Sequence, residues 1–239
     1  MRFGSIEFSP SRWPSLITLI MFGILMSLGF WQLDRAEQKQ LLLDDFQGGS
    51  DSSPFRLDET IKSFEDLQYQ FASAVGSYDA ERQFLHDNRI HNGVAGYQVL
   101  TPLRLKGSNL AVLVNRGWIP LGASRSQLPD VPVSEDEREV IGRIKQALLE
   151  DFRLGEEEQR RGWPYRIQHI DTNLLADELG YRLLPVVLLL EPGASDGFVR
   201  KWHPVTFGPE RNVGYAVQWF GLALALAIIY MAVNIRRVK

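Results

Sequence analysis

The stretch that decides the fold is GYAVQWFGLALALAIIYMAVNI, Gly214 to Ile235, which holds no charged residue over 22 positions. It is followed directly by Arg236, Arg237 and Lys239. At a rise of about 1.5 Å per residue, a helix of this length can cross the roughly 30 Å hydrocarbon core of a bilayer. An apolar run with a basic flank is typical of a membrane-spanning helix. The pattern predicts a span over these residues.

A second uncharged run covers the 19 residues from Ser15 to Leu33. A secretory signal peptide has a shorter apolar region and small residues at its cleavage site, whereas this run ends in Gly-Phe-Trp-Gln-Leu. Trp13 and Trp31 lie at its two ends, and indole rings favour the headgroup layer of a bilayer. We therefore expect a retained first span and not a cleaved leader.

Two spans place both tails on one side of the membrane and a single domain, residues 34–213, on the other. We expect an N-terminal tail over 1–14, spans over 15–33 and 214–235, and a C-terminal tail over 236–239. The first helix should continue beyond the membrane over 34–47. The tails carry net charges of +1 and +3, which leaves -7 for the loop out of a total of -3. This asymmetry favours cytoplasmic tails and a periplasmic domain.

The loop between the spans has the pattern of a β-rich domain. Short runs rich in β-branched and aromatic residues alternate with Gly, Asn and Asp, as in strands joined by hairpins. One short helix is predicted at Thr172 to Leu179, with Asp171 or Thr172 as its N-cap and Gly180 after its end. The fold class expected is an α+β membrane protein, with two transmembrane helices around an antiparallel β-rich extracytoplasmic domain. The expected strands are Tyr69–Tyr78, Gln83–Asp87, Gly96–Leu105, Leu110–Asn115, Val140–Ala147, Arg166–Ile170 and Val186–Leu190.

Composition excludes several classes of function. The chain has no cysteine, which rules out disulfides, thiol catalysis and copper delivery by paired thiolates. The segment before the first span is too short and too poor in Arg for a mitochondrial transit peptide, so a bacterial inner membrane is expected.

The sequence GASDG, residues 193–197, matches G-x-S-x-G, but the residues after it read as extended. A nucleophile elbow needs a helix there, so we expect a Gly-rich loop instead.

Four stretches carry a family resemblance: GFWQLDRAEQK (Gly29–Lys39), GVAGYQVLTPL (Gly93–Leu103), VLVNRGWIP (Val112–Pro120) and GYAVQWF (Gly214–Phe220). Together they resemble the Surfeit locus family of cytochrome c oxidase assembly factors. The resemblance implies a two-helix hairpin around an extracytoplasmic domain and help in forming the haem a site of oxidase subunit I. It implies no enzymatic turnover. The implied partners are subunit I, other oxidase assembly factors and the bilayer, without nucleic acid, and the implied cofactor is a transiently bound haem a.

The resemblance gives candidate site residues in both parts of the chain. Helical spacing would put Trp31, Arg35 and Lys39 on one face just outside the membrane. Arg116 and Trp118 should lie at a strand end, because Asn115-Arg116-Gly117 is a turn-forming group. At that position the Arg116 guanidinium could pair with a haem propionate. Read without the family, Trp31 is an interfacial anchor followed by ordinary snorkelling cations, and Trp118 is a core residue beside a solvent-facing Arg116. The candidates for haem a or subunit I are Trp31, Arg35, Arg116, Trp118, His203 and Trp219, and those for partner contact are Gln32, Lys39, Tyr215 and Gln218.

One position departs from the family pattern. Many members carry a histidine three residues before the tyrosine of GYAVQWF, and this chain has Asn212 there. An amide is not among the usual ligands of haem iron. His203 is the nearest alternative ligand, and we expect propionate and ring contacts to dominate over ligation. Gln218, polar within the second span, is expected to face the first helix, for example Gln32, or a partner subunit.

Two alternatives to a haem a assembly factor follow from the same sequence. One is a membrane-tethered periplasmic enzyme, which would need a convergent acid, base or nucleophile, and the chain shows none at motif spacing. The other is a scaffold of the oxidase that never contacts haem. The sequence does not separate this scaffold from the assembly factor.

Overall fold

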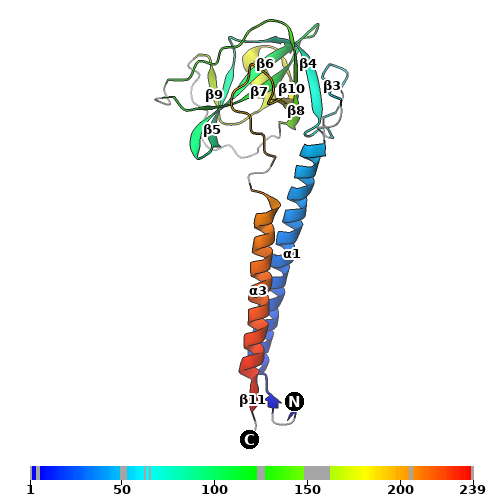
Figure 1. Cartoon of the computed structure of the whole chain (residues 1–239), viewed down its shortest axis with the longest axis vertical. Coiled ribbons are helices and arrows are strands. Elements are labelled where there is room, and N and C mark those ends of the chain that lie inside the picture. The colour runs from blue at the N-terminus through cyan, green and yellow to red at the C-terminus, as the bar shows by residue number, and fades with distance from the viewer. Residues whose placement is uncertain are drawn as a thin grey trace. The chain divides into compact units, whose positions relative to one another are not determined.

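The structure is a computed structural model that describes residues 2–3, 6–48, 53–61, 63–64, 66–122, 127–147, 162–204 and 207–237. The chain divides into two compact units. The helical unit comprises Met1–Asp45 and His203–Lys239, and the barrel unit comprises Phe46–Trp202 (Figure 1).

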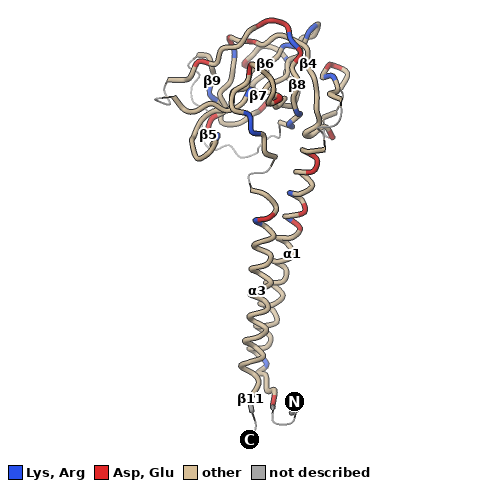
Figure 2. Tube along the Cα trace, in the orientation of Figure 1, with Lys and Arg blue, Asp and Glu red and all other residues tan. Residues whose placement is uncertain are grey.

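Two long helices make up most of the helical unit. Helix α1 runs without a break over Arg12–Gly48, 37 residues, and α3 runs over Pro209–Asn234, 26 residues. Both are long and apolar enough to cross a membrane, with a mean hydropathy of 2.0 over their most apolar windows. Figure 2 shows a long charge-free stretch in each helix, with charges confined to the ends. Helix α3 begins five residues before the expected span, with Pro209 in its first turn, where a missing N–H costs nothing.

Small residues let the two helices approach each other. A Cβ placed on Gly29 would lie 2.3 Å from the ring of Phe220, so only glycine fits there without a shift. The alanines Ala36, Ala216 and Ala223 are buried, each 6% exposed or less. Further along, the Ser15 and Tyr230 hydroxyls form a hydrogen bond of 2.6 Å. These contacts fix an antiparallel register in which Gly29 lies opposite Phe220.

A small sheet pairs the segment before α1 with the residues that follow α3. Strands β1 (Arg2–Phe3) and β2 (Ile6–Phe8) pair antiparallel, and β11 (Ile235–Arg237) pairs antiparallel with β2. From the sequence, these residues are expected to be tails or the end of a span. Their short runs carry no alternation long enough to predict a strand, and the pairing depends on two segments more than 220 residues apart in sequence.

The barrel unit is an eight-stranded sheet in the order β3-β4-β8-β10-β7-β6-β5-β9. An additional pairing between β4 and β6 closes its five central strands into a barrel. The expected α+β fold, a β-rich domain between two long apolar helices, is confirmed. Pairing is antiparallel around most of the barrel, but β7 and β10 pair in parallel, as do β3 with β4 and β5 with β9. The strands are β3 (Phe55–Arg56), β4 (Phe71–Tyr78), β5 (Phe84–His91), β6 (Val94–Leu105), β7 (Leu110–Pro120), β8 (Arg138–Gln146), β9 (Tyr165–Ile167) and β10 (Arg182–Leu190).

Alternating side chains along these strands divide into an inner and an outer core. The inner core includes Val112, Val114, Ile144, Leu188 and Leu103, all fully buried. The outer core lies under helix α2 (Thr172–Leu179), which packs its buried residues against outward-facing side chains of β7 and β10.

The predicted limits of helix α2 are confirmed. Its N-cap is Asp171, whose side chain accepts from two backbone N–H groups, and Gly180 ends it at a φ of 75°.

Glycines shape the strands that carry the family motifs. Asn92 and Gly93 have φ values of 49° and 79°, the conformation of a two-residue type I′ turn, and they join β5 to β6. A Cβ on Gly96 would meet the Trp118 ring at 2.6 Å, so the backbone approaches this ring closely. The expectation that a strand ends at Asn115–Gly117 is wrong. Strand β7 continues to Pro120, and Gly117, with a φ of 116°, lies in a bulge.

The segment GASDG forms a loop after β10. Residues 191–198 are turns and irregular structure, and Val199 forms an isolated bridge with Trp118, so no helix follows Ser195. The expected Gly-rich loop is confirmed, and the geometry of a nucleophile elbow is absent from this described segment.

Candidate functional site

A chain of amide hydrogen bonds links the two helices. The Lys39 ammonium donates to Asn212 Oδ1 at 2.6 Å, and Asn212 Nδ2 donates to Gln32 Oε1 at 2.6 Å. Lys39, Asn212 and Gln32 are partly buried, and Ala36 lies buried one turn from each of the two α1 residues. We call these three residues the interhelical clasp. Sequence reasoning named Lys39 and Gln32 for partner contact, but the structure uses them to hold α1 against α3.

Trp31 and Arg35 lie on an exposed part of α1. The Arg35 guanidinium lies 5.8 Å from the Trp31 ring centroid, within the range of a cation–π contact. Its Nη1 also donates to Gln38 Oε1 at 3.0 Å. Trp31 is 51% exposed, so about half of its surface is open to a ligand or to lipid. Trp31 and Arg35 therefore come together as expected, while Lys39 turns away from them toward α3.

Gln218 does not face the first helix. Its side chain is exposed, and the hydrogen bonds of the described residues include none to it, while Gln32 is bound by Asn212 instead. The first alternative, contact with helix α1, is wrong because the α1-facing positions of α3 are Asn212 and Ala216, and Gln218 is two residues, or about 200°, further round the helix. The second alternative, contact with a partner subunit, stays a prediction. From the Gly29–Phe220 contact, Gln218 is about level with Trp31. Both then lie near the polar boundary of the apolar stretch.

The remaining candidates of the helical unit surround the start of α3. Arg211 lies over the rings of Phe207, at 4.2 Å, and Tyr215, at 5.8 Å, and its Nη2 donates weakly to the Tyr215 hydroxyl at 3.4 Å. Trp219 is partly buried. His203 is exposed in the segment before α3. An exposed histidine is open to a ligand, but its surroundings do not orient its ring.

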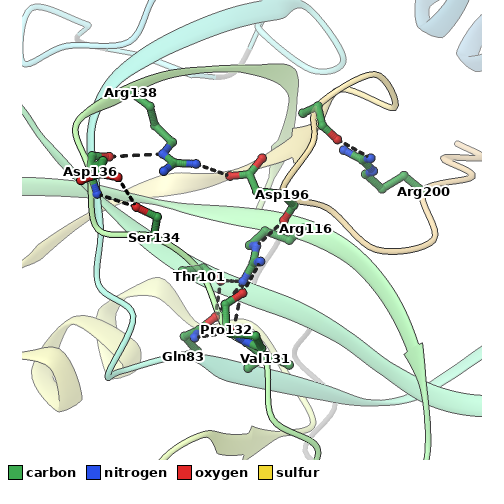
Figure 3. A network of polar contacts seen from close by, with 11 residues as sticks. Gln83, Thr101, Arg116, Val131, Pro132, Ser134, Asp136, Arg138, Asp196 and Arg200 are labelled. Atoms are coloured by element: carbon green, nitrogen blue, oxygen red, sulfur yellow. Dashed lines mark hydrogen bonds and ion pairs between the residues drawn. The ribbon is translucent and has the colours of Figure 1, made fainter.

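Arg116 lies inside one end of the barrel, which sequence reasoning missed. It is 2% exposed, and its guanidinium donates to five acceptors that come from four different segments (Figure 3). These acceptors are Gln83 Oε1, Thr101 Oγ1 and the backbone oxygens of Val131, Pro132 and Asp196, at 2.8–3.4 Å. Burial lowers the pKa of Arg116 from its ordinary value. All three guanidinium nitrogens donate within the barrel unit, so we assign Arg116 to the stability of the barrel.

Two further arginines hold the loop beside Arg116. Arg138 Nη1 pairs with Asp196 Oδ2 at 3.2 Å (Figure 3). Arg200 donates to the backbone oxygens of Glu191 and Ala194. Arg138 also lies 5.6 Å from the Tyr78 ring. Burial raises the pKa of the Tyr78 hydroxyl, which therefore stays protonated at neutral pH. The arrangement is a fixed structural network, because each of the three arginines already has acceptors within the barrel unit.

Trp118 also has a structural role in the barrel. Its indole N–H donates to the Arg89 backbone oxygen at 2.8 Å, and its ring packs across Gly96 and 5.1 Å from the His91 ring. The side chain is partly buried. A flat ring held in this way can still expose an edge, but its N–H is not free for a ligand.

His86 is a buried histidine in the same sheet. It is 6% exposed, and its Nε2 lies 3.1 Å from the Gln168 backbone oxygen and also contacts Arg89 Nη2. Burial, together with the nearby Arg89 charge, lowers its pKa to about 3. It is therefore neutral at physiological pH. Among the described residues, no group of three or more His, Cys, Asp or Glu could hold a metal ion.

A cavity of about 300 Å³ opens on the outer face of the barrel. Its lining includes Phe46, Phe71, Arg143 and Trp202. The Arg143 guanidinium lies 4.5 Å from the Phe46 ring centroid and 4.1 Å from that of Phe71. Sequence reasoning missed this cavity because its walls come from segments far apart in the chain, none with a motif. The contacts of Arg143 show a packed guanidinium and do not define a ligand.

Comparison with known proteins gives a consistent assignment. The model of the SURF1 family matches residues 19–224, from within α1 to within α3. The SURF1-like protein of Rickettsia felis is 27% identical over 226 residues, which cover 91% of this chain and 95% of that protein. Surfeit locus protein 1 of Takifugu rubripes is 25% identical over 240 residues, 94% of this chain and 96% of the relative. Surfeit locus protein 1 of Xenopus tropicalis is 23% identical and matches 99% of this chain and 82% of its own length.

The matched region contains all four motifs quoted above and both sides of the interhelical clasp. It also contains Arg116 and Trp118 of the barrel. Because the family model covers most of the sequence and joins the two units, the chain belongs to the SURF1 family.

Proposed function

We propose that the chain is a membrane assembly factor for haem-copper cytochrome c oxidase, which assists formation of the haem a site in subunit I. The observation that carries this proposal is the family match over residues 19–224, which includes both apolar helices and the barrel. In this proposal α1 and α3 span the inner membrane of a bacterium, with the barrel on the periplasmic side. The protein acts by binding subunit I and other assembly factors and carries out no reaction of its own.

The exposed face of α1 is the part of the molecule best suited to bind cargo. Trp31 is half-exposed, and Arg35 is an exposed cation beside it. A guanidinium pairs well with a carboxylate, and a charge-assisted hydrogen bond of this kind is worth about 1.5–3 kcal/mol. These two residues would hold haem a by one propionate and by ring contact. Bound haem a would supply the macrocycle that is passed to subunit I.

The proposed binding does not depend on iron ligation at position 212. The Asn212 amide is engaged on both sides, by Lys39 and by Gln32. His203 is exposed and remains the alternative ligand. Binding through a propionate and a ring face leaves the complex exchangeable, which a transfer factor requires. A scaffold that acts without haem is the competing function.

Haem content of the purified full-length protein separates these possibilities. Protein from cells that make haem a should contain it, Arg35→Gln should contain less, and His203→Ala should match the wild type. A low-spin histidine-ligated spectrum that disappears in His203→Ala would contradict binding by propionate. If every preparation lacks haem while subunit I still co-purifies, the scaffold function is the correct one.

Membrane topology is tested independently of haem. Reporter fusions at Lys239 should behave as cytoplasmic, and insertions near Asp130 should behave as periplasmic. A periplasmic signal from the fusion at Lys239 would contradict the proposed hairpin.

A further inference from the structure

Lys39 differs from an ordinary surface lysine in the kind of acceptor it contacts. Its ammonium is partly buried beside α3, and its acceptor is the neutral amide oxygen of Asn212. Within the described part of the chain, no carboxylate lies within ion-pair distance of Lys39, in contrast to Lys106, which pairs with Glu137 at 2.7 Å. An ammonium has three N–H donors, and one of them is used here. Among the described residues, the charge of Lys39 is therefore not paired with a carboxylate.

The interhelical clasp holds this charge in a fixed place. Asn212 Nδ2 donates to Gln32, so the amide oxygen of Asn212 must point to Lys39. The clasp thus presents donors at both ends, the remaining N–H groups of Lys39 and the amide N–H groups of Gln32. A group that completes it must accept hydrogen bonds and carry negative charge.

The position of Lys39 along α1 indicates where such a group would come from. Lys39 is six residues beyond Leu33, the last residue of the uncharged run, which is about 9 Å of helix. Helical side chains point toward the N-terminus of their helix, so Lys39 reaches back toward the apolar stretch. On α3, Asn212 points the opposite way and meets it. The ammonium therefore lies at about the depth of the phosphate groups of a bilayer.

We infer that Lys39, held by Asn212 and Gln32, is a binding site for the phosphate of an anionic phospholipid. The site is separate from the exposed Trp31–Arg35 face assigned to haem a. A bound phosphate oxygen would accept the free N–H groups of Lys39 and neutralise a charge between two helices. The bound lipid would thereby strengthen the packing of α1 against α3. The inference rests on the bilayer insertion proposed above.

The test compares lipids retained by the full-length protein. Protein is reconstituted in vesicles of phosphatidylcholine, alone or mixed with phosphatidylglycerol, and bound lipids are counted by native mass spectrometry. The wild type should be enriched in phosphatidylglycerol about fivefold over the vesicle composition, because the one ammonium held in the interhelical clasp favours the headgroup with a net negative charge. Lys39→Gln should abolish the enrichment, and Lys39→Arg should keep part of it.

A matched control separates this site from general surface charge. Arg211 is next to Asn212 in the chain and also exposed at the start of α3, but it does not take part in the interhelical clasp. Arg211→Gln removes the same charge and should keep the enrichment. An equal loss in Lys39→Gln and Arg211→Gln would overturn the site. Displacement of the lipid by soluble glycerol phosphate would show a site for free phosphate and would also overturn it.

The wild-type protein alone can also refute the inference. If it inserts in vesicles but binds both lipids in proportion to their amounts, the site does not exist, and the proposed function is unaffected. If it is extracted from the vesicles by alkaline carbonate, the membrane anchoring in the proposed function is wrong. The preference of the wild type is measured without any variant, so a misfolded Lys39→Gln does not prevent a result.

Discussion

The barrel and the helical unit use the same polar residue types in opposite ways. In the barrel, Arg116 is 2% exposed and donates to five acceptors from four segments. In the helical unit, Arg35 is exposed and has one hydrogen bond, to a residue three positions away. Both arginines belong to stretches that carry the family resemblance. A shared motif therefore marks either a fold requirement or a contact surface, and burial distinguishes the two.

The largest effect should come from removing the buried guanidinium. Arg116→Met would leave the side chains of Gln83 and Thr101 and several backbone oxygens without their donor. Loss of a buried polar network of this kind costs about 3–5 kcal/mol of unfolding free energy. Urea unfolding of the full-length protein in detergent measures it. The control Arg35→Met should stay within about 0.5 kcal/mol of the wild type. If Arg116→Met and Arg35→Met are equally stable, the buried arginine of the barrel is no more structural than the exposed arginine of the helical unit.

A smaller loss of unfolding free energy is expected when the glycine in the bulge of β7 is replaced. Gly117 has a φ of 116°, and a Cβ there would lie 2.8 Å from the Val199 backbone oxygen. Gly117→Ala must adopt a strained conformation and displace backbone, which we expect to cost about 2–3 kcal/mol. The same unfolding measurement applies. Gly193→Ala is the control, because nothing lies within 4 Å of its added Cβ. If Gly117→Ala is as stable as this control, the bulge does not constrain the barrel.

The barrel should also respond to pH through His86, which is neutral in the folded state. Its folded pKa of about 3 lies below the ordinary value of 6.5, so the unfolded chain binds the proton more readily. The contribution of neutral His86 to the unfolding free energy is fully present above pH 6.5. It is lost as the pH falls from 6.5 toward 3, by up to about 1.4 kcal/mol per pH unit. At pH 5 we expect a loss of about 2 kcal/mol. In His86→Asn this part of the pH dependence should disappear, whereas the exposed His203→Asn should leave it unchanged.

The smallest effect is expected in the helical unit. Asn212→Ala removes two interhelical hydrogen bonds, and such bonds average about 0.6 kcal/mol each in membrane proteins. We expect a loss of about 1 kcal/mol in the unfolding of the helical unit by sodium dodecyl sulfate. Gln218→Ala removes an exposed amide and should have no effect. If Asn212→Ala loses more unfolding free energy than Arg116→Met, the interhelical clasp matters more for stability than the buried arginine of the barrel.

The parts of the fold that depend on local pattern were predictable. Uncharged runs predicted the two helices, and Asp171 with Gly180 predicted both ends of α2. Gly, Asn and Asp between the short apolar runs predicted hairpins, and the turn at Asn92 and Gly93 is one of them. These features depend on residues close together in sequence, where propensity and periodicity act directly.

The candidate site was predictable only in part, because burial depends on residues far apart in sequence. Arg116 looked like a surface residue beside a turn, and only the approach of the 131–132 and 196 backbone oxygens shows that it is enclosed. Asn212 was recognised as a departure from the family, but its two partners lie 173 and 180 residues away. The contact between Trp31 and Arg35 was predictable, because helical spacing of four places them together.

The central claim is that cargo binds to the exposed face of α1, and capture of oxidase subunit I tests it most directly. Full-length tagged protein carrying Arg35→Glu is compared with wild type and with Lys106→Glu, the same charge reversal on the barrel surface. Loss of a charge-assisted contact predicts about tenfold less co-purified subunit I for Arg35→Glu, with unchanged unfolding, and no change for Lys106→Glu. Wild-type capture by Arg35→Glu, or an equal fall in both variants, would contradict the account.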